Sequence, residues 1–190
     1  KILKLNSNNL GCYEYDVGNG ICLVQCDDTE ECSGNLPEEI GALLKLDTLQ
    51  LSYNNLTGDI PESITQLDQL TYLKFDNNNF TGSIPEDIGA MGDLKYLYLN
   101  TNKLSGEIPQ SIGSLTNLKR FYVHANDLSG EIPGSICNIY SANQSFALLL
   151  ENNQFCLAST GYPECIPEYH LCQHLGQLGL NFPELSVDEL

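Results

Sequence analysis

A 24-residue period in the middle of the chain constrains its fold more than any other feature. The segments 46–61, 70–85, 94–109 and 118–133 align residue for residue without a gap. Each carries an asparagine, a glycine and a proline at the same place: Asn54, Asn78, Asn102 and Asn126; Gly58, Gly82, Gly106 and Gly130; Pro61, Pro85, Pro109 and Pro133. A repeat of this length buries its apolar side chains only against a neighbouring copy, so the sequence predicts a stacked solenoid.

Each position in the repeat has a physical role. Leu49 and Leu51 are separated by one polar residue, which is typical of a short half-buried strand. Asn54 follows, and its amide can bond the backbone groups that the turn leaves unpaired, so the stacked asparagines are predicted to form a ladder. Gly58 suits a tight bend and Pro61 ends any hydrogen-bonded run. Other apolar positions of the coil are expected to point inward: Leu46, Leu56, Ile60, Ile64 and Leu67.

The second half of each coil follows the motif L-x-G-x-[IL]-P-x-x-I-G-x-L. The matching segments are NLPEEIGALLKL, DIPESITQLDQL, SIPEDIGAMGDL and EIPQSIGSLTNL. Over residues 33–140 the chain resembles the plant-type extracellular leucine-rich repeat proteins, which include receptor-kinase ectodomains and polygalacturonase-inhibiting proteins. The resemblance implies an α/β fold: a right-handed solenoid with a concave parallel β-sheet and short 3₁₀ or helical turns on the convex side.

The cysteines lie at the two ends of the chain and are missing from the regular middle. They are Cys12, Cys22, Cys26, Cys32, Cys137, Cys156, Cys165 and Cys172. An even number confined to the ends favours disulfides made in an oxidising compartment, two at each end, with zinc at Cys22-x-x-x-Cys26 as the alternative. Stacking favours the pairs Cys137–Cys165 and Cys156–Cys172. The sequence therefore predicts a solenoid with disulfide-stabilised ends.

We expect residues 1–190 to form a single leucine-rich repeat domain. Its first coil, 1–36, contains a cysteine-rich insertion at 11–31. Regular repeats occupy 37–140, a C-terminal cysteine cap 141–175, and a tail 176–190. The numbering starts at Lys1 rather than at a methionine, so we expect a processed or partial chain from a secreted or cell-surface protein. No apolar run approaches the roughly 18 residues of a membrane span, so no direct membrane insertion is expected.

Charge and motif content argue against several classes of function. The formal net charge of −17 comes from 8 Lys and Arg against 25 Asp and Glu, and such a surface repels nucleic acid. The sequence contains no G-x-S-x-G, H-E-x-x-H or phosphate-loop motif, so neither an enzyme nor a cofactor is predicted. His170-x-Cys172-x-His174 is too short a motif, and too near an expected disulfide, to predict a metal site.

The exposed positions of the concave strands are the predicted ligand-binding surface. Packing fixes only the alternating leucines, so side-chain identity is free between them. Neighbouring strands lie about 4.8 Å apart, and the tyrosines at these positions should therefore form one aromatic field bordered by basic side chains. Tyrosine also simply suits strands, which is the alternative explanation. The predicted ligand-binding residues are Tyr72, Lys74, Tyr96, Tyr98, Arg120, Tyr122 and His124.

These features predict a secreted or cell-surface recognition module that binds a protein, peptide or glycan. Two alternatives stay open: a structural subunit of an extracellular assembly or matrix, and an inhibitor of a cell-wall hydrolase. Three N-x-[ST] sequons, at Asn55, Asn79 and Asn143, are predicted glycan acceptors. The first two sequons are also part of the repeat consensus, so they would be present without glycosylation.

Overall fold

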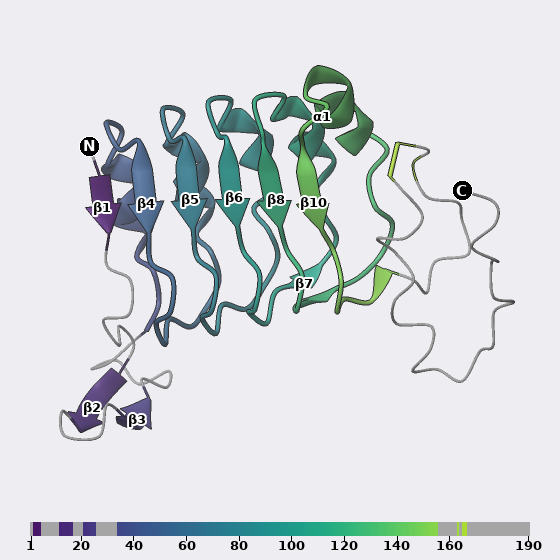
Figure 1. Ribbon diagram of the computed structural model, residues 1–190. Coiled ribbons are helices and arrows are strands. Elements are labelled where there is room, and N and C mark those ends of the chain that lie inside the picture. Colours follow the sequence, from purple (N-terminus) through teal and green to yellow (C-terminus); the bar gives the residue numbers. More distant parts are fainter. Residues whose placement is uncertain are drawn as a thin grey trace, which may run out of the picture.

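The computed structural model describes residues 2–4, 12–16, 21–25, 34–155, 163 and 165–166. Its main feature is a six-stranded parallel sheet with the strand order β1-β4-β5-β6-β8-β10 (Figure 1). These strands are β1 (Ile2–Lys4), β4 (Thr48–Gln50), β5 (Tyr72–Lys74), β6 (Tyr96–Tyr98), β8 (Arg120–Tyr122) and β10 (Ala147–Leu149). Each coil contributes one strand, so the sheet runs along the solenoid.

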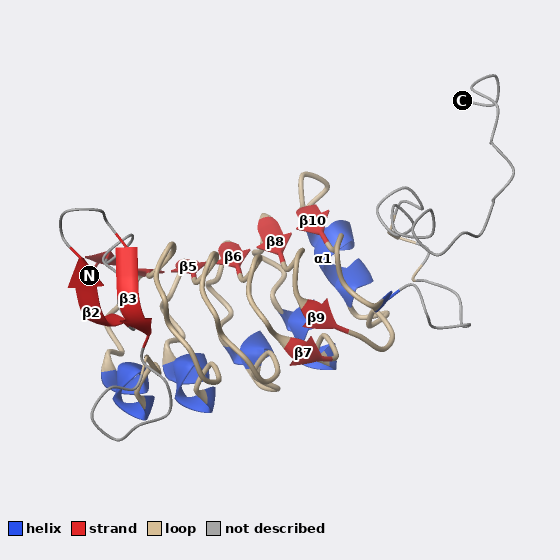
Figure 2. Ribbon diagram, turned by 90° about the horizontal axis from the view of Figure 1, so that it is seen from below, coloured by secondary structure: helices blue, strands red, loops and turns tan. Residues whose placement is uncertain are grey.

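Short helical turns form the opposite layer (Figure 2). Four are 3₁₀ turns, η1 (Glu38–Ala42), η2 (Glu62–Gln66), η3 (Ile88–Ala90) and η4 (Gln110–Ser114), and the fifth is the α-helix α1 (Ile136–Ala142). The repeat proline fixes the start of these turns: the Pro61 carbonyl accepts the amide hydrogen of Ile64, with N and O 3.0 Å apart. Ile64 then points into the core. The predicted solenoid with convex 3₁₀ turns is confirmed.

The core lies between the sheet and the turns. Leu49 and Leu73 are fully buried at the centres of β4 and β5, between partly exposed neighbours, as alternation along a strand requires. The five other positions expected to point inward are also buried: Leu46, Leu56, Ile60, Ile64 and Leu67. Two-residue strands β7 (Ser105–Gly106) and β9 (Asp127–Leu128) add a small second parallel sheet beside this core.

The predicted asparagine ladder is confirmed. Asn78 Nδ2 donates to the carbonyl oxygens of Phe75 in its own coil and Leu51 in the preceding coil, at 3.1 and 3.0 Å. Its Oδ1 accepts the amide hydrogen of Leu56, with N and O 3.1 Å apart. Asn102, Asn126 and Asn153 repeat this pattern in the following coils. The ladder therefore ties each coil to the one before it.

The turn before each ladder asparagine uses a left-handed residue that the sequence analysis did not predict. Backbone φ lies between 55° and 58° at Tyr53, Asn77, Thr101, Ala125 and Asn152. Positive φ is uncommon outside glycine and is least favourable for a β-branched residue such as Thr101. The neighbouring coil holds this turn, because the amide of Asn54 donates to the carbonyl oxygen of Asn77 at 3.2 Å. Stacking thus holds Tyr53, Thr101 and Ala125 in a conformation that they do not favour on their own, whereas the two asparagines adopt it more readily.

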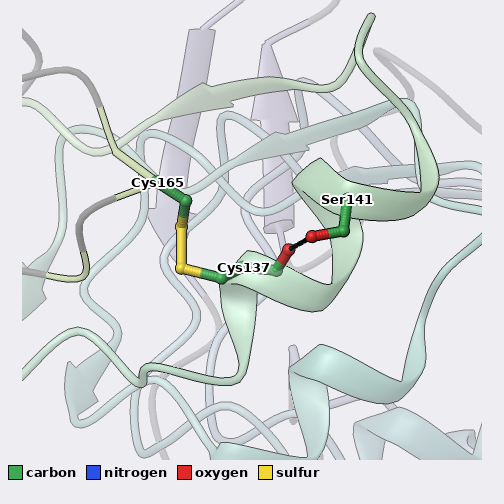
Figure 3. Close-up of a disulfide and its surroundings, with 3 residues drawn as sticks. All are labelled: Cys137, Ser141 and Cys165. Atoms are coloured by element: carbon green, nitrogen blue, oxygen red, sulfur yellow. Dashed lines mark hydrogen bonds between the residues drawn. A yellow bond between two sulfur atoms is a disulfide. The ribbon is translucent and has the colours of Figure 1, made fainter.

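The inserted segment and the C-terminal cap are described only in part. The antiparallel hairpin β2 (Cys12–Asp16) and β3 (Ile21–Gln25) lies within the predicted insertion, away from the repeat sheet (Figure 1). At the other end Cys137 of α1 is bonded to Cys165, with Cα atoms 5.5 Å apart, and Ser141 Oγ donates to the Cys137 carbonyl oxygen (Figure 3). The pairing favoured by stacking is therefore present.

Several predictions fall on parts of the chain that the structure does not describe. They concern the side chains of Cys12 and Cys22, the residues Cys26, Cys32, Cys156 and Cys172, the histidines His170 and His174, and the tail 176–190. Within the described ranges, the structure contains no helix that combines the length and the apolar character of a membrane span.

We expect the native protein to contain four disulfides and no free thiol. A thiol-specific alkylating reagent should therefore label no cysteine of the native protein, and should label all eight after denaturation and reduction. Intact mass with and without reduction measures this, and mapping of unreduced peptides should recover a peptide linked through Cys137 and Cys165. Labelling of two or more cysteines in the native state would contradict the prediction.

Candidate functional site

Four tyrosines from three neighbouring strands form a continuous ring surface on the sheet. This tyrosine cluster comprises Tyr72 of β5, Tyr96 and Tyr98 of β6, and Tyr122 of β8. Strand register places Tyr72 beside Tyr96 and Tyr98 beside Tyr122. The ring centroids are 4.8 Å apart in the first pair and 5.0 Å apart in the second. The contiguous aromatic field expected from the sequence is present.

Tyr98 is the centre of the cluster. Its ring lies 5.8 Å from that of Tyr72 and stacks parallel to that of Tyr96 at 6.4 Å. It is 8 % exposed, whereas the other three tyrosines are half-buried. Partial burial, together with the Tyr98 hydroxyl, raises the pKa of Tyr72 above its ordinary value of 10.0. The Tyr72 hydroxyl is therefore uncharged at neutral pH.

Lys74 is held over the central ring by a buried carboxylate. Its Nζ lies 5.0 Å from the centroid of Tyr98 and 3.7 Å from Asp76 Oδ1. Asp76 is 5 % exposed, and its two oxygens accept hydrogen bonds from Ser52 Oγ at 2.6 Å and from Asn77 Nδ2 at 2.9 Å. Because both carboxylate oxygens are bonded, Asp76 is fixed and can orient the lysine above the ring. The sequence analysis did not identify this role for Asp76.

Arg120 and His124 lie at the edge of the cluster. The guanidinium Nη1 of Arg120 donates to the Tyr98 hydroxyl at 3.4 Å. This bond raises the pKa of Arg120 above its ordinary value, so the side chain stays charged. The His124 ring lies 6.2 Å from that of Tyr122. Its Nδ1 is buried and has no hydrogen-bond partner among the described residues. The predicted charged role of His124 stays a prediction.

The sequons occupy two different settings. Asn55 and Asn79 lie at equivalent places in adjacent coils, partly exposed, just after the turns that end the strands. Asn143 follows α1; its Nδ2 donates to the Leu118 carbonyl oxygen and its Oδ1 accepts the amide hydrogen of Ser145, both at 3.0 Å. Glycosylation at all three stays a prediction. Within the part of the chain that the structure describes, no cluster of histidine, cysteine or acidic side chains is placed to hold a metal ion.

A family model described as a leucine-rich repeat region matches residues 25–136, more than half of the chain. This chain belongs to the leucine-rich repeat family. Its solenoid, with a parallel sheet and short convex turns, agrees with that membership. No match to a curated protein was found.

Solved structures similar to this leucine-rich repeat chain are plant receptor ectodomains. The plant peptide hormone receptor RGFR1, in complex with RGF2, is 37 % identical with a TM-score of 0.60, over 64 % of this chain and 19 % of the receptor. The Arabidopsis receptor kinase HAESA, in complex with the peptide hormone IDA and the co-receptor SERK1, is 35 % identical with a TM-score of 0.57, over 64 % and 20 %. This chain spans about a fifth of the length of these two receptors.

One similar structure matches over most of its own length. The ectodomain of the receptor kinase SOBIR1 from Arabidopsis thaliana is 31 % identical, with a TM-score of 0.58, and the match covers 67 % of each chain. The leucine-rich repeat ectodomain of SOBIR1 is therefore similar to this chain over two thirds of its own length.

Proposed function

We propose that this leucine-rich repeat chain is an extracellular recognition module that binds a peptide or protein ligand on its concave sheet. The observation that carries the proposal is the tyrosine cluster: four rings in mutual contact across three strands, at positions where solenoid packing leaves the side chain free. Tyrosine offers a large apolar face and a hydrogen-bonding tip, which is why it is enriched in recognition surfaces.

The cluster is organised before any ligand binds. Tyr98 is packed among its neighbouring rings, Lys74 lies over its face, and Arg120 bonds its hydroxyl. Side chains already held in place lose little conformational freedom on binding, so less of the interaction energy is spent on ordering them. A surface that served only to suit the strand conformation would not need this lateral support.

The similar structures favour a peptide or protein ligand over a glycan. RGFR1 and HAESA are complexes with the peptides RGF2 and IDA, and HAESA also engages the co-receptor SERK1. These relatives also support a location at the outer face of the cell, either secreted or as part of a membrane receptor. We propose no catalytic activity. A structural subunit or a hydrolase inhibitor would differ in which residues its partner contacts.

The test is affinity for a partner captured on the immobilised protein and then identified. Tyr96→Ala and Tyr98→Ala should each weaken binding by about 2 kcal/mol, roughly 30-fold, because both remove a central ring. The control is Gln110→Ala, an exposed residue at the start of η4 on the opposite side. Tyr98→Phe keeps the ring and should separate loss of the surface from loss of the Arg120 bond.

One outcome would contradict the proposal. If the tyrosine variants bind as tightly as the wild type while changes within 11–31 abolish binding, the partner contacts the inserted segment and the concave-surface proposal is wrong. Thermal melting of each variant shows whether a loss of affinity reflects unfolding.

A further inference from the structure

Three basic residues lie close together at the side of the solenoid where the strands begin. Lys95 precedes β6, Lys119 precedes β8, and Arg120 is the first residue of β8. The Lys95 carbonyl oxygen accepts two amide hydrogens from the next coil, that of Lys119 at 2.8 Å and that of Arg120 at 3.2 Å. These bonds bring the three backbones together in two adjacent coils. We call this group the basic edge.

The charges of the basic edge are not neutralised by the described residues. All three side chains are exposed, and none makes an ion pair within the described ranges. The equivalent positions in the flanking coils are uncharged: Thr71 and Tyr72 on one side, Phe146 and Ala147 on the other. The sequence has only 8 Lys and Arg in a chain of net charge −17, so three unpaired cations at one place are a marked local reversal of sign.

The basic edge is continuous with the tyrosine cluster. Arg120 pairs in register with Tyr96, and its guanidinium bonds the hydroxyl of Tyr98. Neighbouring strands lie about 4.8 Å apart and an extended peptide advances about 3.4 Å per residue, so two or three residues of one peptide reach from the rings to the cations. That bond uses one of the guanidinium's five N–H donors, and the planar arrangement of the others suits a carboxylate.

We propose that Lys95, Lys119 and Arg120 bind acidic side chains of a peptide whose aromatic or apolar residues lie on the tyrosine cluster. This inference rests on the proposed function and assigns its ligand a chemical class, an acidic peptide. The opposed charges steer such a ligand to this edge and away from the acidic remainder of the surface. An anionic polysaccharide would also be attracted, and the experiment below separates the two.

The test is an NMR titration of ¹⁵N-labelled protein with two capped hexapeptides, Ac-(Glu-Tyr)₃-NH₂ and Ac-(Gln-Tyr)₃-NH₂. The caps leave only side-chain carboxylates as anions. We expect the glutamate peptide to shift the amide signals of Lys95, Lys119 and Arg120 saturably. It should bind about tenfold more tightly than the glutamine peptide, since each exposed ion pair contributes up to about fivefold. This preference should disappear at about 0.5 M salt.

Matched variants locate the effect. Lys119→Gln should reduce the preference for glutamate about two- to fivefold, whereas Lys103→Gln removes the same charge from the side where the chain leaves the strands and should change nothing. The triple variant Lys95→Gln/Lys119→Gln/Arg120→Gln should bind both peptides equally.

Several results would overturn the inference: equal affinity of the wild type for the two peptides, no binding of either, or a preference that survives in the triple variant. An oligogalacturonate that binds these residues more tightly than the glutamate peptide would overturn the assignment to a peptide. Binding of the captured partner distinguishes failure of this inference from failure of the proposed function. If its binding needs Tyr96 and Tyr98 but tolerates the triple variant, the concave surface stands and the basic edge does not.

Discussion

Asn78→Ala is expected to lower the free energy of unfolding by about 3 kcal/mol. The asparagine side chain accepts the amide hydrogen of Leu56, a buried residue that has no other acceptor among the residues the structure describes. Its donor bonds to Leu51 and Phe75 matter less, because the Leu51 carbonyl also accepts from Asn54 and the Phe75 carbonyl also accepts from Asn102. The cost therefore comes chiefly from one stranded N–H group, to which the small cavity left by the amide adds.

Denaturant unfolding of Asn78→Ala, Asn102→Ala and the exposed control Asp93→Ala measures this difference. The control should unfold at nearly the wild-type midpoint. Asn78→Asp retains an acceptor for Leu56 but turns a buried carboxylate oxygen toward the Leu51 and Phe75 carbonyl oxygens, so at neutral pH it should be at least as destabilised as the alanine variant. Equal midpoints for the ladder variants and Asp93→Ala would refute the ladder as a source of stability.

Gly113→Ala should destabilise the protein by about 2–3 kcal/mol through overpacking alone. An added Cβ would lie 2.7 Å from the carbonyl carbon of Ser135 in the next coil, well inside contact distance. Ser135 is not free to retreat, because its Oγ donates to the Gln110 carbonyl oxygen at 2.7 Å. Gly113 does not have positive φ, so lack of space and not backbone strain decides the result.

Gly92→Ala is the matched control. A Cβ at Gly92 would meet no atom within 4 Å, and the residue is exposed. Its free energy of unfolding should lie within about 0.5 kcal/mol of that of the wild type. If both glycine variants unfold at the same denaturant concentration, with unchanged slopes, close packing of the convex turns contributes less than the structure indicates.

The sequence was sufficient to predict which strand positions lie side by side. The 24-residue period assigns Thr48, Tyr72, Tyr96 and Arg120 to one column, and the observed register pairs them in that order. Stacking likewise favoured the Cys137–Cys165 bond. Both succeed for one reason: in a solenoid, position within the repeat determines position in space, so alignment of the coils replaces the search for long-range contacts.

The details that differ between coils could not be predicted in this way. Ser52 and Asp76 occupy the same repeat position in two adjacent coils, and their bond depends on side-chain rotamers that a repeat pattern does not specify. The same limit explains why Lys95 and Lys119 were not identified. They lie just outside the strand, where the pattern assigns no role, and their importance appears only when the uncharged neighbouring coils are seen beside them.

One junction departs from the regular convex packing. Thr65 stands where Gly41, Gly89 and Gly113 stand in other coils, and the next coil has Asp87 where the others have serine. The turn η3 is correspondingly shorter than η1, η2 and η4. At the other junctions the glycine of one coil makes room for the serine and its backbone on the next, and here both members of that contact are replaced.

The asparagine ladder runs in one direction along the chain, so each coil depends on the coil that follows it. The amide hydrogens of Leu56, Phe80, Leu104 and Leu128 are each accepted by an asparagine that belongs to the following coil. A coil therefore cannot close its own turn until its successor is in place. Unwinding from the C-terminal end would release Leu128 first, then Leu104, Phe80 and Leu56, one coil at a time. The covalent bond between Cys137 and Cys165 lies at the end where that sequence of events would begin.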